Sequence, residues 1–209
     1  MARYTDPVCR KCRRIGEKLF LKGERCYTPR CAVERRKAPP GEQVPRRRRS
    51  SDWAIQLKEK QKARFTYGVL ERQFRKYFQV AREQSGVTGD VLMQLLERRL
   101  DNVVYRLSFA DSRSQGRQLV NLGHFVVNGK RADIPSYQVK AGDVISWKKT
   151  NGSKPEFINA LTDGLPKRPV PPWLKLSEAE LTGEVLNLPD IEDVESVVDV
   201  RLIVEFYSR

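Results

Sequence analysis

The sequence predicts an α+β protein: a cysteine knuckle and helices come first, a small module of one helix and a hairpin follows, and a mixed strand and helix tail ends the chain. Apolar residues recur every three or four positions through much of residues 50–107, the spacing of a buried helix face. An Asn-Gly pair at 128–129 separates two short strand-like runs, which is typical of a β-hairpin. Near the end, Leu202, Val204 and Phe206 alternate as in a strand whose apolar side packs inward on the helices.

The chain is large enough for a real core, because its 209 residues are 39% hydrophobic. We divide it into a cysteine knuckle with a basic arm (1–49), a helical segment (50–92), a module (93–165) and a tail (166–209). No apolar run reaches the roughly 18 to 20 residues of a membrane-spanning helix. The amino terminus also lacks an apolar stretch of the signal-peptide type. We therefore expect neither a membrane protein nor a secreted one.

The charge is strongly basic and unevenly placed. The 40 Lys and Arg exceed the 26 Asp and Glu by 14 charges. Residues 1–64 carry 20 basic and 7 acidic side chains, whereas residues 151–209 carry 6 and 11. Like charges in the first third of the chain repel one another so strongly that this part needs a polyanion as partner. The acidic tail argues against non-specific binding. We expect a nucleic acid partner, because membrane binding would need a broad apolar face that the basic run lacks.

All four cysteines lie in two short pairs near the start of the chain. Cys9 and Cys12 are separated by two residues, and Cys26 and Cys31 by four. Two such turns joined by a short loop can bring four thiolates to one tetrahedral centre, which predicts one structural zinc ion. A four-iron four-sulfur cluster uses the same four ligands and stays open. A third possibility for the four cysteines is two disulfides, although nothing indicates an oxidising compartment.

The basic residues around the cysteines are compatible with a metal knuckle that also binds phosphate. Arg10, Lys11, Arg13 and Arg14 would favour the thiolate form and leave surplus positive charge for RNA. The segment has so few apolar residues that we expect the metal to substitute for a core.

A polybasic strip and a helix follow the knuckle. Arg46, Arg47, Arg48 and Arg49 follow a proline-containing linker and are expected to track a phosphate backbone, since each arginine offers a fork of donors. A solvated charge run or a localisation signal is the alternative. Ser50, Ser51 and Asp52 are candidate caps for a helix that Gly68 stops; its basic residues include Lys58 and Lys62.

Two further helices are expected before the module. Phe74, Tyr77, Phe78 and Ala81 form one stripe at helical spacing, which indicates a core face and not a base-stacking surface. A third helix begins after Thr88 or Gly89. Its apolar stripe is long enough to bridge two subdomains and comprises Leu92, Leu96, Leu100, Val103 and Leu107.

The module combines a capped helix with a hairpin. Ser112 and Gln115 read as a capping box, and Arg113 and Arg117 are expected to share one exposed face. The hairpin is followed by a third strand over Val144–Trp147. A short helix whose arginines stand beside a basic hairpin suits structured RNA better than a DNA major groove.

Four motifs of the module carry a resemblance: Ser112–Val120, Gly123–Gly129, Pro135–Ser136 and Gly142–Ile145. Together they resemble the small RNA-binding module named after bacterial small-subunit ribosomal protein four. Some pseudouridine synthases and tyrosyl-tRNA synthetases share that module, so it implies RNA binding without specifying the protein.

Motifs in the rest of the chain narrow the resemblance to the ribosomal protein four family itself, in a cysteine-containing form. They are Arg3–Tyr4, the four cysteines, Leu21–Cys26, Glu34–Arg36, Pro39–Gly41, Leu57–Gln61, Glu71–Phe74, Arg99–Leu107, Pro172–Leu174 and Leu202–Arg209. Gly116 departs from the alanine that the family usually carries, and a glycine inside a helix costs up to about 1 kcal/mol unless close approach of an RNA backbone needs it.

The resemblance implies a structural protein of the cytoplasmic ribosome. Such a protein binds a junction in the five-prime domain of small-subunit ribosomal RNA early in assembly, contacts ribosomal protein five of the small subunit, lines the path along which messenger RNA enters, and contributes to decoding accuracy. The residues expected to bind RNA are Arg3, Arg10, Lys11, Arg13, Arg14, Arg35, Arg36, Arg46, Arg47, Arg48, Arg49, Lys58, Lys62, Arg72, Arg113, Arg117, Gln118, His124, Asn128, Lys130 and Arg131.

An enzyme is not expected. The acidic run at Asp190, Glu192, Asp193 and Glu195 is typical of a solvated face. The single histidine, His124, has no nucleophile motif beside it, and no phosphate-binding loop or dinucleotide fingerprint occurs. The remaining alternatives are an RNA-modifying enzyme that uses the same module and a zinc-containing DNA-binding protein.

Overall fold

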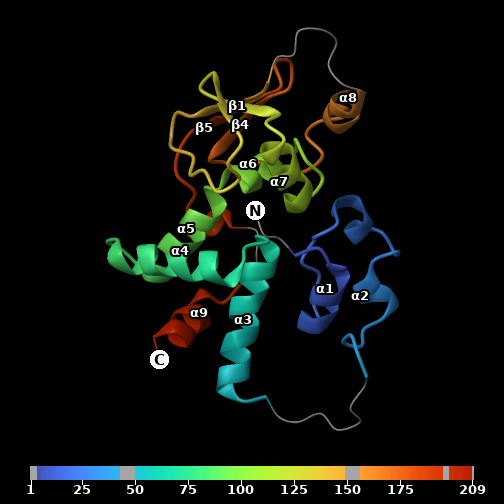
Figure 1. Cartoon of the computed structure of the whole chain (residues 1–209), viewed down its shortest axis with the longest axis vertical. Helices are drawn as coiled ribbons and strands as arrows, with labels where there is room; N and C mark the ends of the chain where they lie inside the picture. Colours follow the sequence, from blue (N-terminus) through green and yellow to red (C-terminus); the bar gives the residue numbers. More distant parts are fainter. Residues whose placement is uncertain (1–3, 43–49, 149–155, 195–197, 209) are drawn as a thin grey trace. The chain divides into compact units, whose positions relative to one another are not determined.

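The computed structural model describes residues 4–42, 50–148, 156–194 and 198–208. The chain divides into two compact units, Met1–Leu92 together with Ser196–Arg209, and Met93–Glu195 (Figure 1). The division falls inside helix α5 (Thr88–Glu97). The segment expected as one tail is thus shared, because residues 166–195 belong to the second unit and the last residues to the first.

The cysteine-rich start of the first unit contains three short helices, α1 (Cys9–Ile15), η1 (Gly23–Tyr27) and α2 (Ala32–Arg35). It has a small apolar cluster of Cys12, Ile15 and Leu19, against which Phe65 of the next helix packs. The expectation that this segment lacks a core is therefore corrected: a short loop-rich segment borrows apolar surface from a neighbouring helix.

Helices α3 (Asp52–Thr66) and α4 (Glu71–Glu83) confirm the sequence prediction. The Ser51 side chain accepts a hydrogen bond from the Ala54 N–H at 3.3 Å, which caps α3. Gly68 follows the helix with a φ of 62°, a conformation that favours glycine. The whole apolar stripe of α4 is buried, which confirms that its aromatic residues belong to the core.

The end of the chain is a helix, α9 (Val200–Tyr207), and the predicted strand there is wrong. The Asp199 carboxylate caps it by accepting from the Arg201 N–H at 3.0 Å. Ile203 is its fully buried residue, and Gln56 of α3 donates to Glu205 at 2.9 Å. Arg201 and Glu205 are four residues apart and share one face of the helix, a helical signal that the alternation of Leu202, Val204 and Phe206 obscured.

The predicted third helix is two helices, α5 and α6 (Leu100–Arg106), so the expectation of one long bridging helix is also wrong. Arg99 adopts an extended conformation between them and forms an isolated β-bridge with Gln138. Its neighbours pair with the same segment: the Val139 N–H donates to the Arg98 carbonyl at 3.0 Å. These backbone hydrogen bonds compensate for those lost at the break.

The second unit has a five-stranded antiparallel sheet in the order β2-β1-β3-β5-β4. Its strands are β1 (Phe125–Val127), β2 (Lys130–Ala132), β3 (Val144–Trp147), β4 (Leu174–Ser177) and β5 (Thr182–Val185). The β1–β2 hairpin confirms the prediction, since Asn128 and Gly129 have φ values of 50° and 76°, as a tight two-residue turn requires. The remaining helices are α7 (Arg113–Asn121), α8 (Glu156–Thr162) and η2 (Ile191–Asp193).

Helix α7 packs against α6, and Gly116 allows the close approach. A Cβ at Gly116 would lie 2.8 Å from the Asp101 carbonyl oxygen of α6. The neighbour that needs a glycine here is thus protein backbone, and RNA is not required to explain it. The Ser112 side chain caps α7 by accepting from the Gln115 N–H at 3.3 Å, whereas the Gln115 side chain accepts from the Asp111 N–H. The Ser112 half of the expected capping box is therefore formed, whereas Gln115 binds the Asp111 N–H in place of the Ser112 N–H.

Candidate nucleic-acid interface

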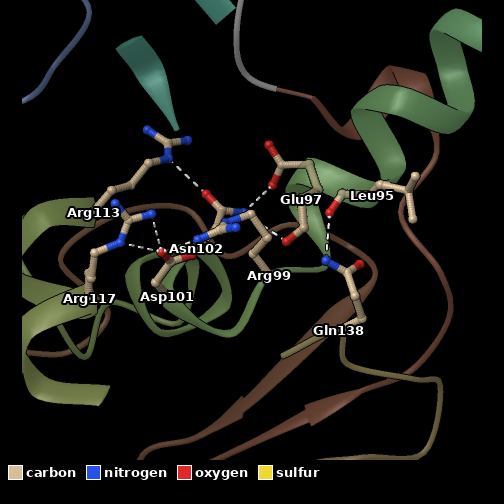
Figure 2. Close-up of polar contacts among 8 residues, drawn as sticks. All are labelled: Leu95, Glu97, Arg99, Asp101, Asn102, Arg113, Arg117 and Gln138. Atoms are coloured by element: carbon tan, nitrogen blue, oxygen red, sulfur yellow. Dashed lines mark hydrogen bonds and ion pairs between the residues drawn. The ribbon is translucent and has the colours of Figure 1, made fainter. Parts of the chain in front are cut away.

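The helix α7 arginines are held by a polar network of α6. Figure 2 shows Arg113 and Arg117 side by side on α7, both reaching toward Asp101 and Asn102. Both arginines are half-buried, which corrects the expectation of an exposed face. The sequence could not show this, because α6 supplies carboxylate and amide partners only once the two helices pack.

Arg113 is oriented by a hydrogen bond and by a ring contact. Its Nε donates to Asn102 Oδ1 at 2.7 Å, and its guanidinium carbon lies 4.4 Å from the centroid of the Tyr105 ring. Arg168 lies over the same ring, at 4.0 Å from its centroid. A planar guanidinium stacked on a ring and bonded through Nε keeps a fixed direction.

Arg117 belongs to a buried ionic cluster with Asp101 and Arg99. Its Nε and Nη2 lie 2.9 and 2.7 Å from Asp101 Oδ2. Arg99 approaches the same carboxylate with Nε at 3.0 Å from Oδ1 and Nη2 at 2.7 Å from Oδ2. Two guanidinium groups thus share one carboxylate whose side chain is 3% exposed.

A second buried carboxylate, that of Glu97, holds the Asn102 side chain in place. Its Nδ2 donates to the Glu97 side chain at 2.6 Å and to the Glu97 carbonyl at 2.9 Å. Arg106 neutralises the same carboxylate, with Nη2 2.7 Å from Glu97 Oε1. Residues 99–107 stood out in the sequence only as a family motif, and Glu97, Asp101 and Asn102 were not predicted to be positioning residues. A carboxylate and an amide in an otherwise apolar helix were the available signal.

The hairpin supplies the exposed part of the module's predicted interface, namely Lys130 and Arg131, and Gln118 is exposed on α7. Asn128 also has a structural role, because its amide donates to Asp143 at 2.8 Å and its oxygen accepts from the Val144 N–H at 2.9 Å. His124 is partly buried, and burial, followed by the Lys148 charge, lowers its pKa.

The basic residues of the first unit separate into exposed and structural ones. Of those predicted to bind RNA, the exposed ones are Arg10, Arg14, Arg35, Arg36, Lys58 and Arg72. Arg13 donates to the Ala38 and Pro39 carbonyls at 3.0 and 3.2 Å, and burial, followed by the Arg64 charge, lowers the pKa of Lys11 to about 8. Lys62 is buried and lies 2.6 Å from Glu17, which corrects the expectation that it faces RNA. Arg3 and Arg46 to Arg49 lie outside the described residues.

The four cysteines are free thiols, and all but Cys9 are buried. Burial raises the pKa of Cys12, and the neighbouring Cys26, Cys9 and Cys31 raise it further, so the four side chains share one region. The Lys22 N–H donates to Cys26 Sγ at 3.4 Å. Within the described part of the chain, no group of three or more His, Cys, Asp or Glu is placed so that it could hold a metal ion. The donor chemistry fits zinc, but the sulfurs do not form a ready metal site.

No helix in the described segments is long and apolar enough to cross a membrane.

Comparison with known proteins agrees with this arrangement of a basic first unit and a second unit that contains the module. Residues 3–97 match the family described as "Ribosomal protein S4/S9 N-terminal domain", and residues 98–145 match the family described as "S4 domain". The small ribosomal subunit protein uS4 of Heliobacterium modesticaldum is 53% identical over 209 residues, with both chains fully covered. The chain belongs to the uS4 family. The uS4 protein of Thermus thermophilus is 53% identical over 210 residues and the uS4A protein of Symbiobacterium thermophilum 51% over 212, again covering both chains fully.

Proposed function

We propose that this chain is a structural component of the small ribosomal subunit that binds ribosomal RNA early in assembly, at a junction of the five-prime domain. The observation that carries the proposal is full-length identity of 53% with small ribosomal subunit proteins. The basic first unit and the fixed arginines of α7 supply what RNA binding requires. The protein acts by binding and is not an enzyme, and its place is the ribosome.

Sucrose-gradient fractionation and footprinting test this function together. We expect the tagged chain to sediment with the small subunit, and the purified chain alone to protect the five-prime domain of naked small-subunit ribosomal RNA from hydroxyl radicals. Protection of that domain only after other proteins are bound would contradict early binding. Sedimentation outside the ribosomal fractions would contradict the function itself.

The finer roles rest on the family resemblance. We propose contacts with ribosomal protein five and with messenger RNA along the path by which it enters, where Arg46 to Arg49 would hold phosphates. Replacing these four arginines with glutamine should leave thermal stability unchanged and slow the unwinding of a structured messenger by assembled ribosomes. A normal unwinding rate would refute the assignment.

The four cysteines are proposed to hold one structural metal, zinc in preference to a four-iron four-sulfur cluster. The support is the presence of four thiol donors in one region, the burial of three of them and the Lys22 N–H directed at Cys26 Sγ. Elemental analysis should find one zinc per chain, and chelation should loosen residues 9–35 while α3, α4 and the module stay folded. Metal-free protein with four freely reactive thiols would overturn the proposal.

The module is proposed to dock on RNA through Arg113 in a fixed direction. Arg113→Lys keeps the charge but loses the Nε bond to Asn102 and the stacked guanidinium. We expect it to weaken binding of a five-prime-domain transcript by about 1–3 kcal/mol, while Arg82→Lys at an exposed site changes it little. Equal affinities for the two variants would show that the module contributes charge without a docking direction.

A further inference from the structure

The first unit contains a cleft with a volume of about 720 Å³ that the sequence did not indicate. It is formed by residues before α1, by α1 itself, by Pro39 and Pro40, by the end of α3 and by residues 68–70 that follow it. This volume lies in the range of sites that hold one small ligand, roughly 300–1,000 Å³. The cleft can therefore take a group of nucleotide size but not an RNA duplex.

The lining of the cleft is basic. Arg10, Lys11 and Arg14 come from α1 and Arg64 from α3, against one carboxylate, Asp6. Arg64 Nη1 also lies 3.5 Å from Glu71 Oε2, and this ion pair helps to hold the side chain in place. Four cations converging from two helices favour a phosphodiester over a neutral or cationic ligand.

Two aromatic rings line the same cleft. Lys11 Nζ lies 3.7 Å from the centroid of the Tyr4 ring and 4.8 Å from that of Phe65, and Arg64 lies 5.0 Å from the Phe65 centroid. The Lys11 ammonium thus covers one face of Tyr4, while the Tyr4 residue remains 41% exposed. A phosphate site needs no aromatic wall, whereas an unstacked base gains from one.

We propose that this cleft binds one unstacked nucleotide of RNA, with its base on Tyr4 and its phosphates between Arg10, Arg14 and Arg64. The proposal deepens the RNA-binding function and rests on it. Phe65 fixes Lys11 and Arg64 by cation–π contact, so that the ring and the cations are in place before RNA arrives. Junctions in folded RNA are where such unstacked bases occur.

Substitution of Tyr4 in the full chain tests the site. The probe is a transcript of the five-prime domain of small-subunit ribosomal RNA, with an unrelated transcript of equal length beside it. We expect Tyr4→Leu to weaken binding on the order of ten- to a hundredfold, and Tyr4→Trp, which keeps a stacking surface, to stay within about threefold of the unchanged protein. Tyr27→Leu is the matched control, because Tyr27 is an exposed tyrosine of the same unit outside the cleft; it should also stay within about threefold.

Salt dependence separates stacking from charge. Tyr4→Leu should leave the slope of log affinity against log salt unchanged, whereas Arg64→Gln should lower it by about 0.7 to 0.9. The proposal is overturned if Tyr4→Leu binds as Tyr27→Leu does, or if it changes the slope as Arg64→Gln does. If the unchanged protein does not prefer the ribosomal transcript, the proposed function fails, and that result is distinct from either outcome.

Discussion

Arg113 and Arg117 show how a single residue type can serve two purposes at one interface. Their spacing of four residues predicts one solvent-facing side of α7. Each side chain nevertheless points toward α6 and donates a hydrogen bond to a residue of that helix. The partners fix the direction of the guanidinium groups before RNA binds, and preorganised donors lose less entropy on binding. The same partners make the arginines part of the fold.

Arg117→Ala is therefore expected to destabilise the second unit by about 1–3 kcal/mol, in contrast to an exposed arginine, whose loss costs less than about 0.5 kcal/mol. The reason is that the buried Asp101 carboxylate would keep its ion pair with Arg99 but lose the one with Arg117. Urea unfolding followed by circular dichroism measures the difference. Lys148→Ala, at an exposed position of the same unit, is the control, and equal unfolding midpoints for the two variants would contradict the structural role.

At the scale of elements, the first unit is held together by contacts between α3, α4 and α9. Glu71 of α4 is the shared partner: its Oε1 lies 2.7 Å from Lys60 Nζ and accepts from the Tyr207 hydroxyl at 2.9 Å. Tyr207 in turn stacks on Phe78, with ring centroids 4.6 Å apart. One carboxylate thus joins two consecutive helices, α3 and α4, to α9, which lies far along the chain.

Glu71→Gln is expected to remove a pH-dependent part of the stability. Burial opposes ionisation of this carboxyl, but hydrogen bonds from Lys60 and Tyr207 outweigh it, and the pKa of Glu71 is lowered. A lowered pKa contributes stability that is present above the unfolded pKa and is lost as the pH falls through the folded value. Urea midpoints should therefore separate the variant from the unchanged protein at pH 7 and converge in acid. Glu83→Gln, at the exposed end of α4, is the matched control.

Helix α9 gives a second prediction for elements, because helix and strand bury different residues. In the helix Ile203 is fully buried, and its neighbours Leu202 and Val204 are partly buried. Ile203→Ala should cost about 2–5 kcal/mol, and Leu202→Ala and Val204→Ala clearly less. Thermal unfolding by circular dichroism measures all three. A larger loss at both neighbours than at Ile203 would favour a strand.

At the scale of the whole molecule, local signals in the sequence were reliable and contacts between elements were not. The hairpin at Asn128 and Gly129, the cap at Ser51 and the apolar stripe of α4 follow from chemistry within a few residues. The break at Arg99 and the burial of Lys62 depend on partners far along the chain, and no local pattern contains those partners. The cleft at Tyr4 was missed for the same reason, since it needs Phe65 beside α1.

The uneven charge of the whole chain leads to the last prediction, the salt dependence of RNA binding. Replacing four exposed arginines of the first unit, Arg10, Arg14, Arg35 and Arg36, with glutamine should lower the slope of log affinity against log salt by about 3 units, since each phosphate contact contributes about 0.7 to 0.9. The control removes the same charge outside residues 4–42, by replacing Lys140, Lys148 and Lys175 of the second unit and Arg201 of α9, all of which are exposed. If long-range attraction alone steered the protein to RNA, both variants would lose slope equally. A slope that falls only in the first variant requires phosphates to sit against α1 and α2, where the excess positive charge of the sequence lies.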